Sequence, residues 1–154
     1  MKNGKNRKET ETAVKDDRLI FLIFTAQLKL KTYLNNALLR EGVTTTTAQS
    51  GILFLLKAKN GQTMSELSQV LSLDNSTLTG LVDRLERAGF VKRNSSTADR
   101  RASHVFITEK GYAETERAKA VIRKVNEQIK ADFSETEVES FKKILKSFFV
   151  RFGS

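Results

Sequence analysis

A run of hydroxyl and guanidinium side chains between residues 76 and 87 has the chemistry to contact a polyanion. Serine and threonine hydroxyls bind phosphates or base edges, and arginine neutralises a phosphate or forms a paired contact with guanine. On a helical wheel one apolar stripe contains Leu78, Leu81, Val82 and Leu85. The opposite face then carries Ser76, Thr79, Gly80, Asp83, Arg84 and Arg87. These outward residues are candidates for DNA contact, and the alternative is an ordinary solvated helix face.

Gly80 lies near the middle of this exposed face. A glycine at such a position costs roughly 1 kcal/mol of helix stability compared with alanine. Close approach of the backbone to DNA would account for the glycine, although neutral change would also leave it there.

A second group of charges lies in the segment from Lys92 to Ser103, between two strand-like runs. Its arginines are Arg93, Arg100 and Arg101. Asp99 precedes Arg101 by two residues, so its carboxylate can brace the guanidinium at the tip of a loop. An arginine held in this way suits a narrow minor groove, whose negative potential attracts it. The alternative is a surface salt bridge worth ~0 to 1 kcal/mol.

The helix that carries residues 76 to 87 is expected to be the second of a helix-turn-helix. Thr63-Met64-Ser65-Glu66 is a capping box, which begins the first helix. Asp74 can cap the second helix, and Gly89 supplies its C-terminal stop. Two short runs, Phe90-Val91 and Val105-Phe106-Ile107, predict a β-hairpin with the charged segment at its tip. Residues 46–112 therefore predict a winged helix-turn-helix, a unit that holds a helix in a DNA groove.

Long helices are expected on both sides of this DNA-binding region. In residues 18–45 the N-terminal helix is apolar on more than one face, so it needs two partners. In residues 113–154 a helix that begins after Thr108 reaches about Asp132, and the capping box of Ser134 and Glu137 opens a last helix. The first of these two carries a narrow apolar stripe, too thin for a buried core helix. Its members are Ala118, Val121, Ile122, Val125 and Ile129.

Five of the ten phenylalanines lie in the final 22 residues, more apolar area than one terminal helix can hide against its own domain. The expected cover is a second copy of the chain. The expected interface residues are Leu19, Phe21, Phe141, Phe148, Phe149 and Phe152. Residues 1–17 are polar and lack periodicity, which predicts a disordered arm. The expected fold is one integrated, mainly α domain with a small β-hairpin, built as a winged helix-turn-helix between long dimerisation helices.

Composition excludes several classes of protein. The chain has 27 lysines and arginines against 18 acidic residues and a net charge of +9, which favours a polyanionic partner. The absence of cysteine excludes disulfides, thiolate catalysis and cysteine-ligated zinc, and the single histidine, His104, excludes a site built on two histidines of one chain. No nucleophile-base pair or carboxylate cluster can be assembled, so we expect neither an enzyme nor a cofactor. The longest apolar run, Leu19 to Phe24, is far short of the roughly 20 residues of a membrane span, which favours a soluble, cytoplasmic protein.

The stretch from Met64 to Ala113 resembles the multiple-antibiotic-resistance regulator (MarR) family of bacterial transcription factors. The resemblance is carried by Leu67-Ser68, the run from Ser76 to Glu86, Gly89, Asp99-x-Arg101, Ile107-Thr108 and Glu109-Lys110-Gly111. Flanking helices of matching length and order extend it over residues 18–152. The chain departs from the family at Thr47, where a proline is frequent, and at Gly80, where a longer polar side chain is frequent.

The resemblance implies an obligate homodimer, joined through the first and the last two helices, whose winged units lie about one DNA turn apart. It also implies roles for single residues. Ser76, Thr77 and Thr79 would probe the major groove, and Arg84 would grip a phosphate. Asp99 would position Arg101 in the minor groove. Members of the family often release DNA when a small aromatic or other anionic effector binds.

We therefore expect a sequence-specific transcriptional regulator. It would be a homodimeric repressor that binds a pseudo-palindromic operator and dissociates from it when a small ligand binds the protein. One alternative is a winged helix that mainly binds another protein. A second alternative is an architectural DNA-binding protein with little sequence preference, which the Gly80 surface and the +9 charge allow.

Overall fold

In a computed structural model of the chain, residues 17–94 and 103–153 are described. The elements follow the order α2 (Leu19–Arg40), α3 (Thr47–Ala58), β1 (Gln62–Thr63), α4 (Met64–Leu71), α5 (Asn75–Arg87), β2 (Val91–Asn94), β3 (His104–Ile107), α6 (Glu109–Lys130) and α7 (Glu135–Arg151). The predicted arm, except for its last residue, lies outside the described residues. The tip of the wing, with Asp99, Arg100 and Arg101, also lies outside them.

The predicted helix starts are confirmed by their hydrogen bonds. Thr63 accepts from the backbone N–H of Glu66, whose carboxylate accepts from the Thr63 N–H at 2.8 Å. Asp74 caps α5 by accepting from the backbone N–H of Thr77 at 2.8 Å. Gly89 follows the end of α5 with a φ of +78°, a conformation that glycine adopts without strain.

The sheet differs from the predicted hairpin in two ways. It has three antiparallel strands in the order β1-β3-β2, because Gln62 and Thr63 pair with Val105 and His104. Two residues are too few to show an alternating pattern, so β1 left no signal in the sequence. In addition, Lys92 to Asn94, which were expected in the loop, extend β2 by pairing with β3.

The main core lies inside the winged helix-turn-helix. It packs side chains of α3, α4 and α5 against the sheet, and its members are Ile52, Leu53, Leu56, Leu67, Leu78, Val82, Leu85, Phe90, Val91, Val105 and Ile107. A smaller cluster joins α2, the segment after it and α6, through Leu38, Val43, Ala118 and Val121. The helices that flank the DNA-binding region are thereby attached to it.

Helix α6 is more deeply buried than its thin apolar stripe predicted. Its buried residues are Gly111, Glu114, Thr115, Ala118, Val121 and Val125. The expectation of a helix outside the core was wrong because three of these residues are glycine or polar, and an apolar pattern does not count them.

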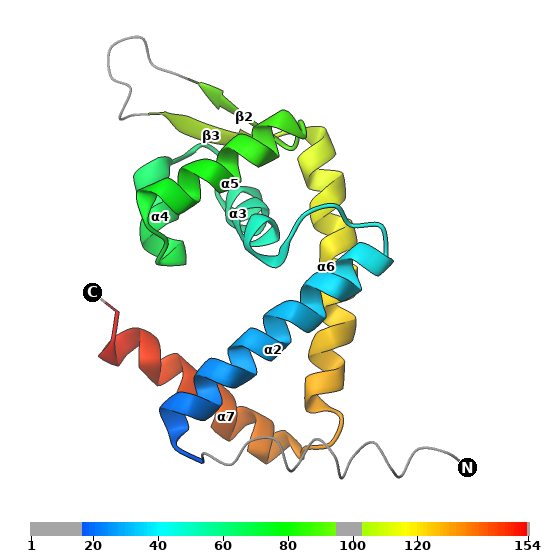
Figure 1. Cartoon of the computed structure of the whole chain (residues 1–154), viewed down its shortest axis with the longest axis vertical. Coiled ribbons are helices and arrows are strands. Elements are labelled where there is room, and N and C mark those ends of the chain that lie inside the picture. Colours follow the sequence, from blue (N-terminus) through cyan, green and yellow to red (C-terminus); the bar gives the residue numbers. More distant parts are fainter. Residues whose placement is uncertain (1–16, 95–102, 154) are drawn as a thin grey trace.

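The elements separate into two ends (Figure 1). Helices α3, α4 and α5 and the sheet gather at one end, and α6 runs from there to the opposite end, where the N-terminal half of α2 and helix α7 lie. In the single chain no residue of the described helix α7 is buried. None of the helices in residues 17–94 and 103–153 combines the length and the apolar character that crossing a membrane requires.

Candidate nucleic-acid interface

Helix α5 presents the predicted face to solvent. Leu78, Val82 and Leu85 have no exposed surface, which fixes the rotation of the helix about its axis. The opposite side therefore points outward and contains Ser76, Thr77, Thr79, Arg84 and Arg87, all exposed. Leu81 and Gly80 lie at the borders of the two faces and are half-buried.

The hydroxyl groups at the start of α5 already donate hydrogen bonds within the helix. Ser76 and Thr77 each donate to the Asp74 carboxylate at 2.6 Å, and these bonds hold the pKa of Asp74 well below its usual range. Thr79 donates to the Asn75 carbonyl oxygen at 2.7 Å. A hydroxyl whose proton is engaged still offers lone pairs. This turn can therefore accept hydrogen bonds from the amino groups of adenine or cytosine in a major groove.

The surface around Gly80 is open, although Gly80 lies at the border of the exposed face and not near its middle, as had been predicted. A Cβ built on Gly80 would meet no other part of the described chain within 4 Å. Packing therefore does not require a glycine here. The absent side chain leaves a smooth surface that a groove could approach closely.

The two arginines at the C-terminal half of α5 differ in their contacts. Arg87 donates from its Nε to the Asp83 carbonyl oxygen at 3.4 Å, and its side chain follows its own helix. Arg84 is exposed and makes no side-chain hydrogen bond or ion pair with the described residues. Its guanidinium is available to a phosphate or to a base.

Arg93 occupies a different setting from the other predicted contacts. From strand β2 its guanidinium donates to Glu86 at 2.6 and 2.9 Å and to Asp83 at 2.5 Å. Its backbone N–H also donates to Glu86 at 3.1 Å. Hydrogen bonding to Arg93 lowers the pKa of Glu86, and hydrogen bonding to Glu86 raises the pKa of Arg93.

These contacts favour a role in fastening the wing to α5 over direct DNA contact by Arg93. They also neutralise two carboxylates, those of Asp83 and Glu86, on the helix that would face DNA. The sequence did not reveal this role, because all three residues are ordinary surface types whose pairing depends on how β2 lies against α5.

The predicted dimer-interface residues lie on helix faces that nothing in the single chain covers. Leu19 on α2 and Phe149 and Phe152 on α7 have exposed fractions of 76%, 79% and 77%. Phe21 and Phe141 are also exposed, whereas Phe148 is half-buried, with its ring edge-on to that of Phe152 at 5.7 Å between centroids. Neighbouring exposed apolar side chains of this kind are typical of an interaction surface.

A helix-turn-helix whose second helix is amphipathic, followed by a paired wing, defines the class of winged helix-turn-helix proteins. The sequence model of the MarR family matches residues 45–103, which run from just before α3 to just before β3. Over these residues the chain matches the MarR family, the resemblance that the motifs of α5 and the wing had predicted.

Similar proteins agree with this assignment. The regulator PecS of Dickeya dadantii is 33% identical over 81 residues, which are 53% of this chain and 49% of PecS. A structure of a MarR variant from E. coli in complex with operator DNA is 28% identical, covers 84% of this chain and 91% of that one, and has a TM-score of 0.75. CouR from Rhodococcus jostii bound to p-coumaroyl-CoA is 25% identical, with coverage of 90% and 94% and a TM-score of 0.73.

Three curated relatives are matched over less than half of their own length, at 38%, 49% and 31%. The solved structures, in contrast, align over nearly their whole length. The fold is therefore shared along the chain, whereas the sequence similarity to these three relatives covers 40%, 53% and 39% of the chain.

Proposed function

We propose that the chain is a cytoplasmic, homodimeric transcriptional repressor that inserts α5 into the DNA major groove. The observation that carries this proposal is the exposed face of α5, which the fully buried side chains of Leu78, Val82 and Leu85 fix in an outward direction. Ser76, Thr77 and Thr79 read base edges, Arg84 binds a phosphate, and Arg87 adds positive charge beside it. The operator-bound MarR variant from E. coli supports this use of the fold.

In this proposal the wing contributes Arg100 and Arg101, with Asp99 holding Arg101 in the minor groove. These residues lie outside the described part of the chain, so their role is carried over from the family motif. Arg93 stabilises the base of the wing through Asp83 and Glu86.

The partner across the dimer interface is a second copy of the chain. The exposed faces of α2 and α7 lie at the end of the molecule away from α5 (Figure 1), so pairing these faces leaves both DNA-reading helices free. A two-fold dimer presents the same helix twice, which matches a pseudo-palindromic operator. The p-coumaroyl-CoA complex of CouR supports release by a small aromatic or anionic effector.

Selection of bound duplexes from a random pool, followed by a binding titration at several salt concentrations, tests the function. We expect a palindromic consensus that binds at least about 10³-fold more tightly than a scrambled duplex. Equal, strongly salt-dependent binding to both duplexes would instead indicate an architectural protein. Absence of binding to either duplex would favour a protein-interaction module.

A further inference from the structure

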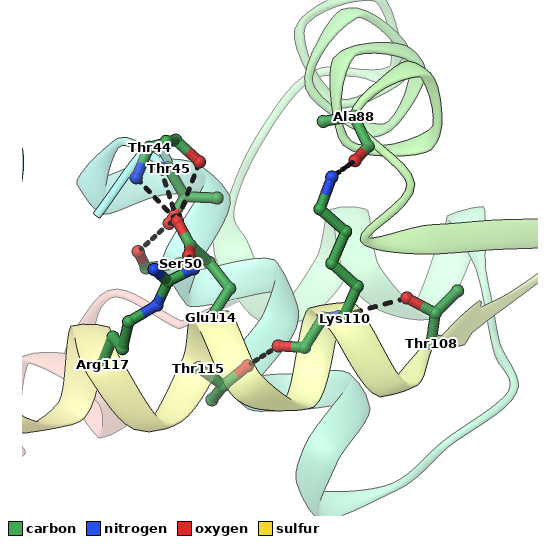
Figure 2. A network of polar contacts seen from close by, with 10 residues as sticks. Thr44, Thr45, Ser50, Ala88, Thr108, Lys110, Glu114, Thr115 and Arg117 are labelled. Atoms are coloured by element: carbon green, nitrogen blue, oxygen red, sulfur yellow. Dashed lines mark hydrogen bonds and ion pairs between the residues drawn. The ribbon is translucent and has the colours of Figure 1, made fainter. Parts of the chain in front are cut away.

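The first turn of α6 holds the end of the DNA-reading helix. Lys110 donates from its ammonium to the Ala88 carbonyl oxygen at 2.6 Å, where α5 ends (Figure 2). The same ammonium lies 4.9 Å from the centroid of the Phe90 ring. A cation at this place neutralises the negative end of the α5 dipole. Lys110, whose side chain is exposed, thus links the C-terminus of α5 to the first turn of α6.

The backbone at the start of α6 is also closely packed against the segment that follows α5. A Cβ on Gly111 would collide with the Phe90 carbonyl oxygen and lie 2.7 Å from Cγ1 of Ile107. Thr108 donates its hydroxyl to the Gly89 carbonyl oxygen at 2.7 Å. The start of α6 therefore lies directly against the segment that links α5 to the wing.

One turn further along α6, the carboxylate of Glu114 holds a second segment. The Glu114 side chain has no exposed surface and accepts hydrogen bonds from the backbone N–H groups of Thr44 and Thr45 at 2.7 and 3.1 Å (Figure 2). It also accepts from the Thr44 hydroxyl at 3.0 Å and pairs with Arg117 at 2.5 Å. These donors belong to the segment between α2 and α3.

Glu114 remains charged in this setting. Burial acts to raise its pKa, but the hydrogen bonds from Thr44 and Thr45 and the charge of Arg117 outweigh burial, and the pKa lies below its ordinary value. Burying a carboxylate is a costly way to obtain stability, since apolar residues of similar volume often stabilise as well or better. The carboxylate instead orients the segment between α2 and α3, because it binds two adjacent backbone N–H groups of that segment at one point on α6.

The remainder of α6 is attached to the C-terminal half of α2, whose N-terminal half lies at the proposed dimerisation end. The Tyr33 hydroxyl of α2 lies 3.1 Å from the side-chain oxygen of Gln128, and Lys124 pairs with Glu41 at 3.2 Å. Helix α6 thus contacts the C-terminal half of α2 and the segment after it, and it contacts the end of α5 at its own start.

We propose that Lys110 and Glu114 are positioning residues that set the separation and angle of the two α5 helices in the dimer. They thereby set the half-site spacing that the protein accepts. This inference rests on the proposed function, because it takes α5 to be the DNA-reading helix of a dimer. Lys110 holds α5 itself, and Glu114 holds the connection between α2 and the DNA-binding region.

The test compares the selected operator with duplexes that carry one base pair more or fewer at its centre. One base pair shifts a half-site by about 3.4 Å and by about a tenth of a turn. We expect the wild-type protein to lose about tenfold or more in affinity for either altered duplex. Lys110→Met and Glu114→Gln should bind the operator more weakly, and their affinities for the three duplexes should lie within about threefold of one another.

Two further variants distinguish a positioning role of the Lys110 side chain from an effect of its positive charge alone. Lys110→Arg keeps a donor for the Ala88 carbonyl oxygen and should retain the wild-type preference for one spacing. Lys119→Met removes the same charge from an exposed position nine residues further along α6, and it should also retain that preference. A loss of folding stability alone would lower the active fraction of protein without changing the ratio of affinities among the three duplexes.

The outcomes distinguish failure of the inference from failure of the function. If the wild-type protein prefers one spacing and Lys110→Met keeps that preference, the inference is overturned, and this holds even if Glu114→Gln does not fold. A wild-type protein that binds its operator without preference for spacing also overturns the inference. A wild-type protein that does not discriminate operator from scrambled DNA overturns the proposed function itself.

Discussion

Replacing Phe149 with alanine tests the proposed dimer at its most exposed phenylalanine. A phenylalanine that becomes buried removes about 150–250 Å² from water. Phe149 has 79% of its surface exposed in the single chain. A partner could therefore cover about 120–200 Å² of it, worth about 3–5 kcal/mol at about 25 cal/mol per Å².

The substitution acts twice in a two-fold dimer. Taking the lower figure, Phe149→Ala should cost about 6 kcal/mol per dimer, which corresponds to about a 10⁴-fold weaker association. Sedimentation velocity over a dilution series measures this change directly. The wild-type protein should remain dimeric throughout the series, whereas the variant should dissociate within it, and its melting temperature should depend on protein concentration.

A matched control is Val70→Ala, which shortens an apolar side chain that is 59% exposed on α4 and lies outside the proposed interface. This variant should associate as the wild-type protein does. If Phe149→Ala stayed as tightly dimeric as Val70→Ala, α7 would not lie in the interface. The apolar face of α7 would then need another explanation.

Three further predictions concern the DNA-reading face and its supports. Arg84→Ala should weaken binding to operator and scrambled duplexes by similar factors and reduce the salt slope by about 1 per half-site; a loss confined to the operator would reassign Arg84 to a base. Gly111→Ala should destabilise the fold by about 1–3 kcal/mol in thermal melting, because a Cβ meets a backbone carbonyl oxygen, whereas Gly80→Ala should stabilise it by up to about 1 kcal/mol; equal effects would contradict the packing. Arg93→Met should cost about 1 kcal/mol at neutral pH, since the ion pairs are partly exposed. Folding lowers the pKa of Glu86, so the stability that the ion pair adds is fully present above the ordinary pKa of 4.5 and is lost as the pH falls through the pKa of the folded state. The free energies of unfolding of wild type and variant should therefore become equal in acid.

Local signals in the sequence were sufficient to predict the helices that matter for DNA binding. The capping box of Thr63 and Glu66 and the cap at Asp74 satisfy backbone groups within three residues of themselves. The apolar stripe of α5 likewise depends only on helical periodicity, so the outward direction of Ser76, Thr79 and Arg84 could be predicted from the chain alone.

Only the tertiary structure decided the features that join these helices to one another. Strand β1 exists because Gln62 and Thr63 meet β3, which lies more than 40 residues later in the chain. Arg93 was predicted as a DNA contact, but the position of β2 beside α5 places its guanidinium between two carboxylates.

Glu114 shows most clearly what could not be predicted from the sequence. By type it belongs to the charged side of α6, but its position, four residues before Ala118 and seven before Val121, places it in line with the apolar stripe, where it is fully buried. The backbone N–H groups of Thr44 and Thr45, about 70 residues earlier, compensate for the loss of hydration. A cap or an apolar stripe is stabilised by neighbours along the chain and is therefore visible in the sequence. A buried carboxylate is stabilised by donors that only folding brings to it, so the sequence around residue 114 does not reveal which groups compensate its charge.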